Sequence, residues 1–426
     1  MESVKNINSS KNLTVKKKKF VYLCSISYDG TVYKTQVIDW LKLYDLNGIT
    51  FDLLQIFHFR LHYNPFLMIK QIKTIRKETH LLKGFLYFFP SKNFLYIINT
   101  LVLYALFLKY IFRYDNILVL SRGMYGREMN LLKKIFPRKI TFYYDARAAS
   151  AEENKYLSNK RNDFSRKRAD IIKYIIDLEN RTLQSADKIF VVSEKLKNYF
   201  IKNYNTPKYK FFLYPCLSDS NKFYYDKKLR ANTRKDLNYT EQDIVYVYAG
   251  GLSSSWHVTD FIFNFFNYAS QKQGNAKFLI LSRDTVSISK MLENNPDLKN
   301  KVIFMSVDNE IIGKYYNASD YGILFRENSI MNNVASPTKF AEYLLCGLPV
   351  LISEGVGDYS DFCKTNGLGF VINEDQLKDN SLLDPGIFQS NEFNRDHISA
   401  IGKKFLTKES ILPKVLELFN TDVASV

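Results

Sequence analysis

The stretch SPTKFAEYLLCGLPVLIS, residues 336–353, combines a helix start, an early acidic residue, a glycine stop and a short apolar run. Ser336 is a good helix N-cap, and Pro337 suits the first helical position, where its missing N–H costs nothing. The backbone N–H groups of Thr338 and Lys339 then lack partners inside the helix and lie at the positive end of its dipole. Helix starts of this kind bind phosphate groups. The stretch therefore predicts a phosphate-binding turn.

The remainder of this stretch adds a second polar group and a strand. Lys339 supplies a full positive charge, and Glu342, one turn further in, carries a carboxylate that can accept two hydrogen bonds from a vicinal diol such as a ribose. Gly347 closes the helix and Pro349 prevents its continuation. Residues 350–352, Val-Leu-Ile, are typical of a buried parallel strand. The alternative interpretation is an ordinary capped helix before a strand.

The longer segment ASPTKFAEYLLCGLPVLIS, followed by EGVGD and GLGFVI, resembles the donor-site helix and next βα unit of GT-B glycosyltransferases. The similarity is to the large retaining group that builds bacterial surface polysaccharides (glycosyl transferases group 1, family 4-like). It extends over nearly the whole chain from about residue 20 and is most specific between 318 and 372. Other segments follow in the order that this family requires: SADKIFVVSEKLKNYF (185–200), FFLYPC (211–216), YAGG (248–251), KFLILSRD (277–284), KVIFMSV (301–307) and ASDYGILFRENS (318–329).

The resemblance implies an α/β fold with two Rossmann-like domains that face each other across a cleft. A chain of 426 residues is also too long for a single core and indicates two domains. We expect a disordered basic tail at 1–19, an N-terminal acceptor domain at 20–216 and a C-terminal nucleotide-sugar donor domain at 217–426, whose last helix is able to pack back on the first domain. The four cysteines are scattered without a CxxC pair, which is typical of reduced core thiols in a cytosolic protein.

Charge is distributed unevenly between the two halves. Residues 1–220 hold 38 Lys and Arg against 18 Asp and Glu, whereas residues 221–426 hold 22 against 25. This asymmetry predicts an anionic partner for the first half, which is a membrane surface, an acidic or pyrophosphate-linked substrate, or nucleic acid. The densest basic segment, 155–173, favours acidic headgroups or a lipid pyrophosphate. The alternative is a solvated basic face without a partner.

The segment FLYIINTLVLYALFLKYIF, residues 94–112, is the one membrane-span candidate by length. A single crossing here would place the strands expected at 20–26 and 116–121 on opposite sides of the bilayer, although one Rossmann-like sheet needs both. We therefore favour a long, mostly buried helix whose outer face, with the aromatic run at 85–89, contacts the membrane interface. A true span remains the alternative.

Candidate acceptor-side residues lie where first-domain strands are expected to end. The strand FVYLCSI (20–26) is followed by Gly30, which matches the family's glycine-containing loop at the cleft or is an ordinary β-turn glycine. Arg122 follows the strand at 116–121. Asp145 and Arg147 follow the strand KITFYYD and resemble the family's acidic-arginine turn, at the edge where open α/β sheets bind ligands. The alternative for these two residues is a plain surface ion pair.

The second domain departs from the family in two places. Gly250 and Gly251 allow a diphosphate to approach the backbone, but the arginine and lysine usual after them are replaced by Ser253 and its neighbours. Val334 stands where the family's first glutamate, eight residues before Glu342, is expected. We expect the missing charge to be supplied by three other basic residues: Arg283, Arg326 and Lys339.

These residues imply a metal-independent glycosyltransferase without a cofactor. A nucleotide-diphosphate sugar binds with its pyrophosphate at Thr338 and Lys339, and Lys339, Arg326 and the helix dipole stabilise the leaving phosphate. His58 and His62 lack a third ligand, so no metal site is expected. By resemblance the reaction retains anomeric configuration, with a lipid-linked saccharide acceptor at the inner face of the cell membrane. The alternatives are an inactive GT-B-like binding protein, a GT-B-like epimerase or phosphorylase, and a nucleic-acid binder, for which no motif is present.

Overall fold

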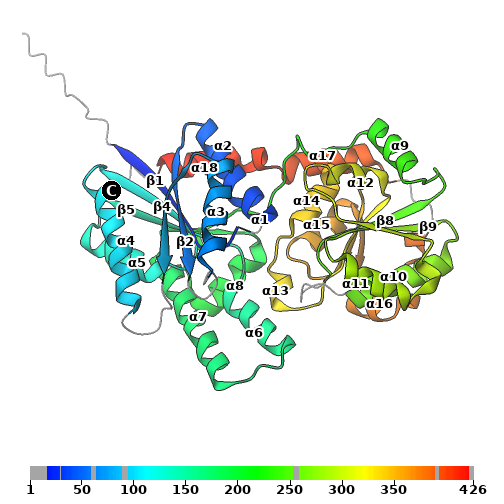
Figure 1. The fold of residues 1–426 in the computed structure, drawn as a ribbon, viewed down its shortest axis with the longest axis horizontal. Coiled ribbons are helices and arrows are strands. Elements are labelled where there is room, and N and C mark those ends of the chain that lie inside the picture. Colours follow the sequence, from blue (N-terminus) through cyan, green and yellow to red (C-terminus); the bar gives the residue numbers. More distant parts are fainter. Residues whose placement is uncertain are drawn as a thin grey trace, which may run out of the picture.

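The chain folds into two α/β lobes that lie side by side (Figure 1). The computed structural model describes residues 17–28, 30–58, 64–88, 95–252, 259–388 and 393–421. Most of the tail expected at 1–19 lies outside these ranges. Lys18 and Lys19, which were expected in the tail, belong instead to the first strand. They are held there because Lys19 pairs with Asp52 on the neighbouring strand (2.6 Å) and Lys18 donates to the backbone oxygen of Phe419.

The first lobe is built on a seven-stranded parallel sheet of order β3-β2-β1-β4-β5-β6-β7. Helices α2, α3 and α18 pack on one face of this sheet, and α4, α5 and α8 pack on the other. The strand order reverses between β1 and β4. Its elements are β1 (Lys18–Cys24), α1 (Thr31–Tyr33), a π-helical turn (Lys34–Ile38), α2 (Asp39–Leu46), β2 (Phe51–His58), α3 (Pro65–Glu78), β3 (Leu82–Phe88), α4 (Leu95–Ile111), β4 (Asn116–Arg122), α5 (Gly126–Ile135), β5 (Ile140–Ala146), α6 (Ser150–Lys160), α7 (Arg166–Ser185), β6 (Lys188–Val191), α8 (Glu194–Tyr204) and β7 (Phe211–Leu213).

The second lobe contains a six-stranded parallel sheet of order β10-β9-β8-β11-β12-β13, which reverses between β8 and β11. Its elements are α9 (Lys227–Asp236), β8 (Ile244–Ala249), α10 (Thr259–Lys272), β9 (Ala276–Leu281), α11 (Thr285–Glu293), β10 (Val302–Met305), α12 (Ile312–Ala318), β11 (Tyr321–Leu324), α13 (Ile330–Asn333), α14 (Thr338–Leu345), β12 (Val350–Ser353), α15 (Tyr359–Asn366), β13 (Gly369–Ile372), α16 (Glu374–Lys378) and α17 (Arg395–Phe405). The predicted α/β class and the buried parallel strand at 350–352 are confirmed.

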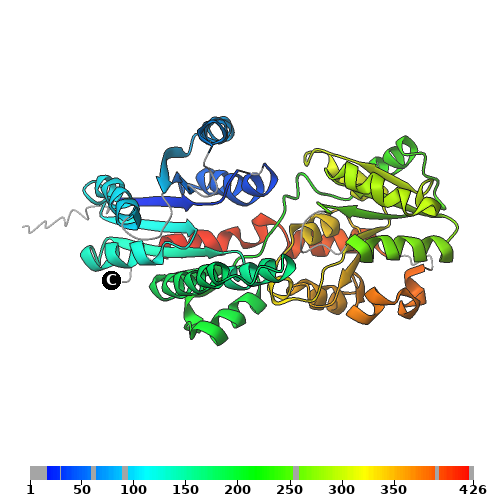
Figure 2. The same cartoon turned by 60° about the horizontal axis from the view of Figure 1, so that its bottom comes forward.

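The last helix, α18 (Lys408–Thr421), leaves the second lobe and lies against the first (Figures 1 and 2). Phe419 is fully buried there, and its ring lies 5.4 Å from that of Phe51 and 5.2 Å from that of Tyr44. At the start of the helix, Lys408 pairs with Asp39 of α2. One apolar cluster thus continues from the first lobe into the second, which ties the two lobes together at the side opposite α6 and α13.

Helix α4 covers most of the membrane-span candidate at 94–112, and it packs one face on the first sheet through Leu103, Phe107 and Tyr110. Within the described ranges, no helix has both the length and the apolar character needed to cross a membrane. The predicted helix is therefore present, but it is not mostly buried, because Leu101 (60% exposed) and the neighbouring Val102 face outward. The aromatic run before it forms β3, an edge strand that sequence analysis missed.

Gly347 ends α14 in the left-handed conformation (φ +65°), as its place after the helix predicts. A Cβ atom there would lie 2.6 Å from the backbone oxygen of Arg395. Gly347→Ala is therefore expected to lower the free energy of unfolding by at least about 1–2 kcal/mol, measured by urea denaturation. Gly274→Ala is the matched control, because a Cβ there meets nothing within 4 Å. Equal midpoints for the two variants would contradict this account.

Candidate active site

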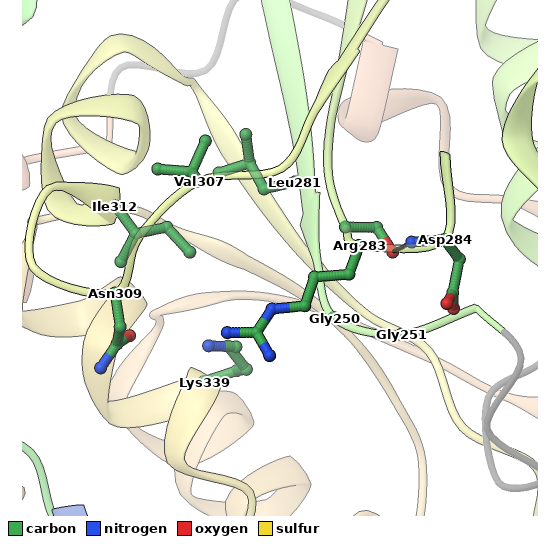
Figure 3. A pocket seen from close by; sticks show the side chains of 10 residues that line it. Gly250, Gly251, Leu281, Arg283, Asp284, Val307, Asn309, Ile312 and Lys339 are labelled. Carbon is green, nitrogen blue, oxygen red and sulfur yellow. Dashed lines mark hydrogen bonds between the residues drawn. The ribbon is translucent and has the colours of Figure 1, made fainter. Parts of the chain in front are cut away.

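A cavity of about 330 Å³ opens at the carboxyl ends of β8, β9 and β10, next to the start of α14 (Figure 3). Open α/β sheets bind ligands at the carboxyl ends of their strands, and β8 is one of the two strands between which the order of the second sheet reverses. Ten residues line it: Gly250, Gly251, Leu281, Ser282, Arg283, Asp284, Val307, Asn309, Ile312 and Lys339. Four of the predicted donor-site residues, Gly250, Gly251, Arg283 and Lys339, thus come together from three separate segments.

Two cationic side chains converge in this cavity. The guanidinium of Arg283, which follows β9, lies beside the ammonium of Lys339 from the first turn of α14 (Figure 3). Lys339 Nζ is paired with Glu342 Oε2 at 2.9 Å, whereas Arg283 is exposed and has no charged or hydrogen-bonding partner within the described part of the chain. Two adjacent cations that share only one carboxylate favour an anion between them.

Helix α14 begins one residue later than predicted, at Thr338 instead of Pro337. The N-cap is Pro337, with extended backbone (φ −69°, ψ 125°), and no side chain caps the helix, so Ser336 is not the cap. The Ser336 hydroxyl instead accepts a hydrogen bond from the Cys216 N–H (3.0 Å) and bonds the Tyr359 hydroxyl (2.9 Å). Ser336 therefore holds the segment that connects the two lobes, at Cys216, against the second lobe. The first helical residues, Thr338 and Lys339, still lie at the positive end of the helix dipole.

Glu342 lies behind Lys339 rather than in the wall of the cavity. Its side chain is buried, and Oε2 accepts hydrogen bonds from Lys339 Nζ and from the Tyr316 hydroxyl (3.1 Å). The carboxylate thus positions the Lys339 ammonium. Its predicted contact with a ribose remains a prediction.

The glycine pair lies directly after β8. Gly250 has φ +151°, and its N–H donates to the backbone oxygen of Leu281 on β9 (3.0 Å). Leu252, which follows the glycine pair, donates its N–H to Asp284 Oδ2 (2.7 Å). This hydrogen bond fixes the course of the loop beside the cavity. Ser253, a predicted donor-binding residue, lies outside the described residues.

Arg326 lies after β11 and lines a different cavity, of about 200 Å³, beside Ser353 and Glu354. Burial lowers the pKa of its guanidinium to about 10, against the opposing influence of Tyr248. Arg326 Nη1 donates to Asn332 Oδ1 (3.2 Å). The structure thus separates Arg326 from the cavity of Arg283 and Lys339, although the Tyr248 hydroxyl next to it donates to Gly251 O (3.1 Å) at that cavity's edge.

A second cavity, of about 370 Å³, opens in the first lobe at the ends of β1, β4 and β5. We call it the first-lobe pocket; its lining includes Ser25, His58, Arg122, Asp145, Arg147 and Glu153. Three of the four predicted acceptor-side residues meet here. Arg122 Nη2 donates to Gln36 Oε1 at 2.5 Å. The fourth, Gly30, has φ +88° and open space around its Cβ position, but it does not line this pocket.

Asp145 and Arg147 form a buried pair, which corrects the alternative of a surface ion pair. Asp145 Oδ1 lies 2.6 Å from Arg147 Nε, and the side chains are 2% and 12% exposed. The Tyr22 hydroxyl donates to Asp145 Oδ2 (3.1 Å), and the guanidinium stacks on the Tyr214 ring at 4.6 Å. Burial alone would lower the pKa of Arg147. The charges of Asp145, Cys216 and Tyr214 raise it by more than burial lowers it, so the pKa lies above its ordinary value.

Val334, at the place of the family's first glutamate, is buried where the two lobes meet. Its backbone oxygen accepts a hydrogen bond from Ser193 Oγ of the first lobe (2.7 Å). The position therefore serves contact between the lobes. Sequence analysis also missed Val307, Asn309 and Asp284 as cavity residues; the signal that points to them is their place after strands β9 and β10, whose ends converge on the glycine pair.

In the described ranges, no group of three or more His, Cys, Asp or Glu side chains is placed to hold a metal ion. His62 lies outside those ranges, and His58 Nε2 lies 3.3 Å from the Tyr125 hydroxyl. All four cysteines are buried free thiols.

Two parallel-sheet lobes, each with a cavity at the carboxyl ends of its strands, are typical of the GT-B fold, and the chain has this fold. Solved structures share it over nearly the full length. HepE from Anabaena in complex with UDP and glucose is 16% identical and covers 95% of this chain and 100% of its own, with a TM-score of 0.64. Sucrose-phosphate synthase from Thermosynechococcus elongatus is 14% identical, with coverages of 96% and 100% and a TM-score of 0.63. WaaG, a glycosyltransferase involved in lipopolysaccharide biosynthesis, is 14% identical, with coverages of 95% and 99% and a TM-score of 0.59. Neither a protein-family model nor a curated protein sequence matches the chain.

Proposed function

We propose that the protein is a retaining glycosyltransferase that moves a sugar from a nucleotide-diphosphate sugar to a saccharide acceptor. The observation that carries this proposal is the convergence of Arg283 and Lys339 on one cavity with the glycine pair and the start of α14. A diphosphate is the common ligand that matches two adjacent cations and free helix N–H groups together. The structures of HepE in complex with UDP and with UDP-glucose support a nucleotide sugar as the donor.

In this proposal the chemistry is electrostatic. Cleavage of the bond between sugar and phosphate places negative charge on the leaving diphosphate. Lys339, Arg283 and the dipole of α14 stabilise that charge, and Glu342 holds the Lys339 ammonium in position. No cofactor is required, and we propose that the reaction is independent of metal ions. Arg326 does not contact the phosphate. Its positive charge lies on the far side of the loop that contains Gly250 and Gly251, and it stabilises the leaving group by long-range electrostatic attraction.

We further propose that the acceptor is a lipid-linked saccharide in surface polysaccharide biosynthesis, used at the inner face of the cell membrane. The WaaG likeness supports such a pathway by analogy of fold alone. The outer face of α4 exposes Ile97, Leu101 and Val102 (43–60%), and Lys109 and Arg113 lie at its end. An apolar face next to cations suits an anionic membrane surface.

The test is to incubate the protein with UDP-, GDP- and ADP-hexoses and to follow sugar release by ¹H NMR, with and without EDTA. The proposal predicts that one donor is hydrolysed slowly, that the sugar is first released with its original anomeric configuration, and that EDTA leaves the rate unchanged. Release with inverted configuration would contradict the retaining mechanism. Binding of a nucleotide sugar without turnover would favour the inactive binding protein, whose missing glutamate is replaced by the buried Val334.

A further inference from the structure

The first-lobe pocket contains a half-buried carboxyl group that has no protein partner among the described residues. Glu153 lies in the first turn of α6 and lines the pocket. Burial raises the pKa of its side chain, and within the described residues the carboxyl has no hydrogen bond or ion pair. The neighbouring Glu152 differs, because it pairs with Lys155 (2.7 Å) and accepts from the Tyr199 hydroxyl (3.0 Å). The Glu153 carboxyl is half-buried and lines the cavity, so solvent or a ligand in the pocket can hydrogen-bond to it.

The same pocket also contains an unsatisfied donor. Arg147 lines it, and Arg147 Nη2 is buried without a hydrogen-bond acceptor in the described part of the chain. Nη1 is engaged differently, with Tyr214 O at 3.5 Å and Cys216 Sγ at 3.7 Å. A buried donor without an acceptor and a half-buried carboxyl without a protein partner therefore belong to residues that line one cavity of about 370 Å³, a volume within the range of ligand sites.

The charges of the pocket wall indicate what kind of ligand fits. The two arginines of the wall, Arg122 and Arg147, are balanced by two carboxylates, Asp145 and Glu153, so these four side chains carry no net charge. A neutral ligand rich in hydroxyl groups can donate to Glu153 and accept from Arg147 at once. An anionic ligand would meet the unpaired carboxylate of Glu153.

Helix α6 places this pocket next to the second lobe. Glu153, Tyr156 and Lys160 are spaced by three and four residues, so they share one face of the helix. The Tyr156 hydroxyl and Lys160 Nζ both bind Glu327 Oε2 of the second lobe, at 2.5 and 3.0 Å. Figure 1 shows α6 reaching α13 across the junction. The face that carries Glu153 thus ends at the turn that follows β11.

We propose that Glu153 is a specificity-determining residue that accepts a hydrogen bond from a hydroxyl of a neutral saccharide unit, which Arg147 Nη2 binds from the other side. This inference rests on the proposed function, because it identifies the pocket as the acceptor site. It assigns no proton transfer to Glu153, which acts by orienting the acceptor.

The test uses methyl β-glucoside, methyl β-galactoside and methyl α-mannoside as probes, titrated by calorimetry with and without saturating UDP. At least one is expected to bind the wild-type protein. Glu153→Leu should weaken that binding at least tenfold, and Glu153→Gln should weaken it about threefold, because the amide oxygen still accepts a hydrogen bond. Glu152→Gln is the matched control and should leave it unchanged. Methyl β-glucuronoside should bind the wild type less well than the glucoside does.

The inference is overturned if no probe binds the wild-type protein, if Glu153→Leu binds as well as the wild type, or if the glucuronoside binds best. UDP affinity is measured for every variant. Failure of the wild type to bind any of UDP, GDP and ADP would refute the proposed function. Normal nucleotide binding with unchanged glycoside affinity in Glu153→Leu would refute the acceptor-site inference alone.

Discussion

Replacement of Lys339 by methionine is expected to lower the rate of glycosyl transfer by about 10²- to 10³-fold, as loss of a preorganised charge at a developing anion does in other enzymes. The affinity for UDP should fall by about 10- to 100-fold, because a charge-assisted hydrogen bond contributes roughly 1.5–3 kcal/mol. The physical reason is the position of the ammonium, which lies beside Arg283 at the cavity and is held there by Glu342.

The variant Arg283→Met distinguishes an effect on nucleotide binding from an effect on protein stability. Lys339→Met leaves the buried Glu342 carboxylate with only the Tyr316 hydroxyl, so some loss of stability is expected as well. Arg283 is exposed and unpaired within the described chain, so its removal should weaken UDP binding without a change in the midpoint of urea unfolding. Lys299→Met, at an exposed lysine of the same lobe, controls for loss of charge. If both Lys339→Met and Arg283→Met bind UDP with the affinity of the wild type, the donor site does not lie in this cavity.

Asp145→Asn is expected to lower the free energy of unfolding by about 3–5 kcal/mol, because it leaves the buried Arg147 guanidinium without its carboxylate. The amide retains the shape of the side chain and can still accept from the Tyr22 hydroxyl. The lost stability therefore reports charge rather than packing. Urea denaturation measures it.

The double variant Asp145→Asn/Arg147→Met is the control for this explanation. Removal of both charges should recover most of the lost stability, because an uncompensated buried ion costs more than an apolar replacement of the pair. If the double variant is no more stable than Asp145→Asn, the pair does not act as a buried ion pair. Asp177→Asn, which breaks the exposed pair with Arg181, should change stability by less than about 1 kcal/mol.

The strands of both sheets were largely predictable from the sequence, because parallel strands buried on both faces are continuous apolar runs. The run at 350–352 and the glycine at 347 are examples, and both are confirmed. The edge strand β3 was missed because Lys83, Gly84 and the exposed Phe85 interrupt its pattern. The short π-helical turn at Lys34–Ile38 has no apolar signal that separates it from an α-helix.

Side-chain partners were less predictable than strands. The sequence pattern assigns Ser336 to a helix cap, but its hydroxyl is taken by Cys216 and Tyr359, which are distant in sequence. Sequence alone also places Arg326 with Lys339, whereas the course of β11 carries it to another cavity. Burial of the Asp145–Arg147 pair likewise depends on Tyr22 and Tyr214, which arrive from other strands and the interdomain connection.

The most direct test of the donor site is the melting temperature of the purified protein with millimolar UDP, GDP, ADP and CMP, each with and without EDTA. A ligand at one hundred times its dissociation constant adds about 2.7 kcal/mol to stability, which is a readily measured shift. The account predicts that one nucleoside diphosphate raises the melting temperature, that EDTA leaves this shift unchanged, and that Arg283→Met diminishes it. A melting temperature that none of these nucleotides alters would contradict the assignment of the cavity at Arg283 and Lys339 as a nucleotide-sugar site.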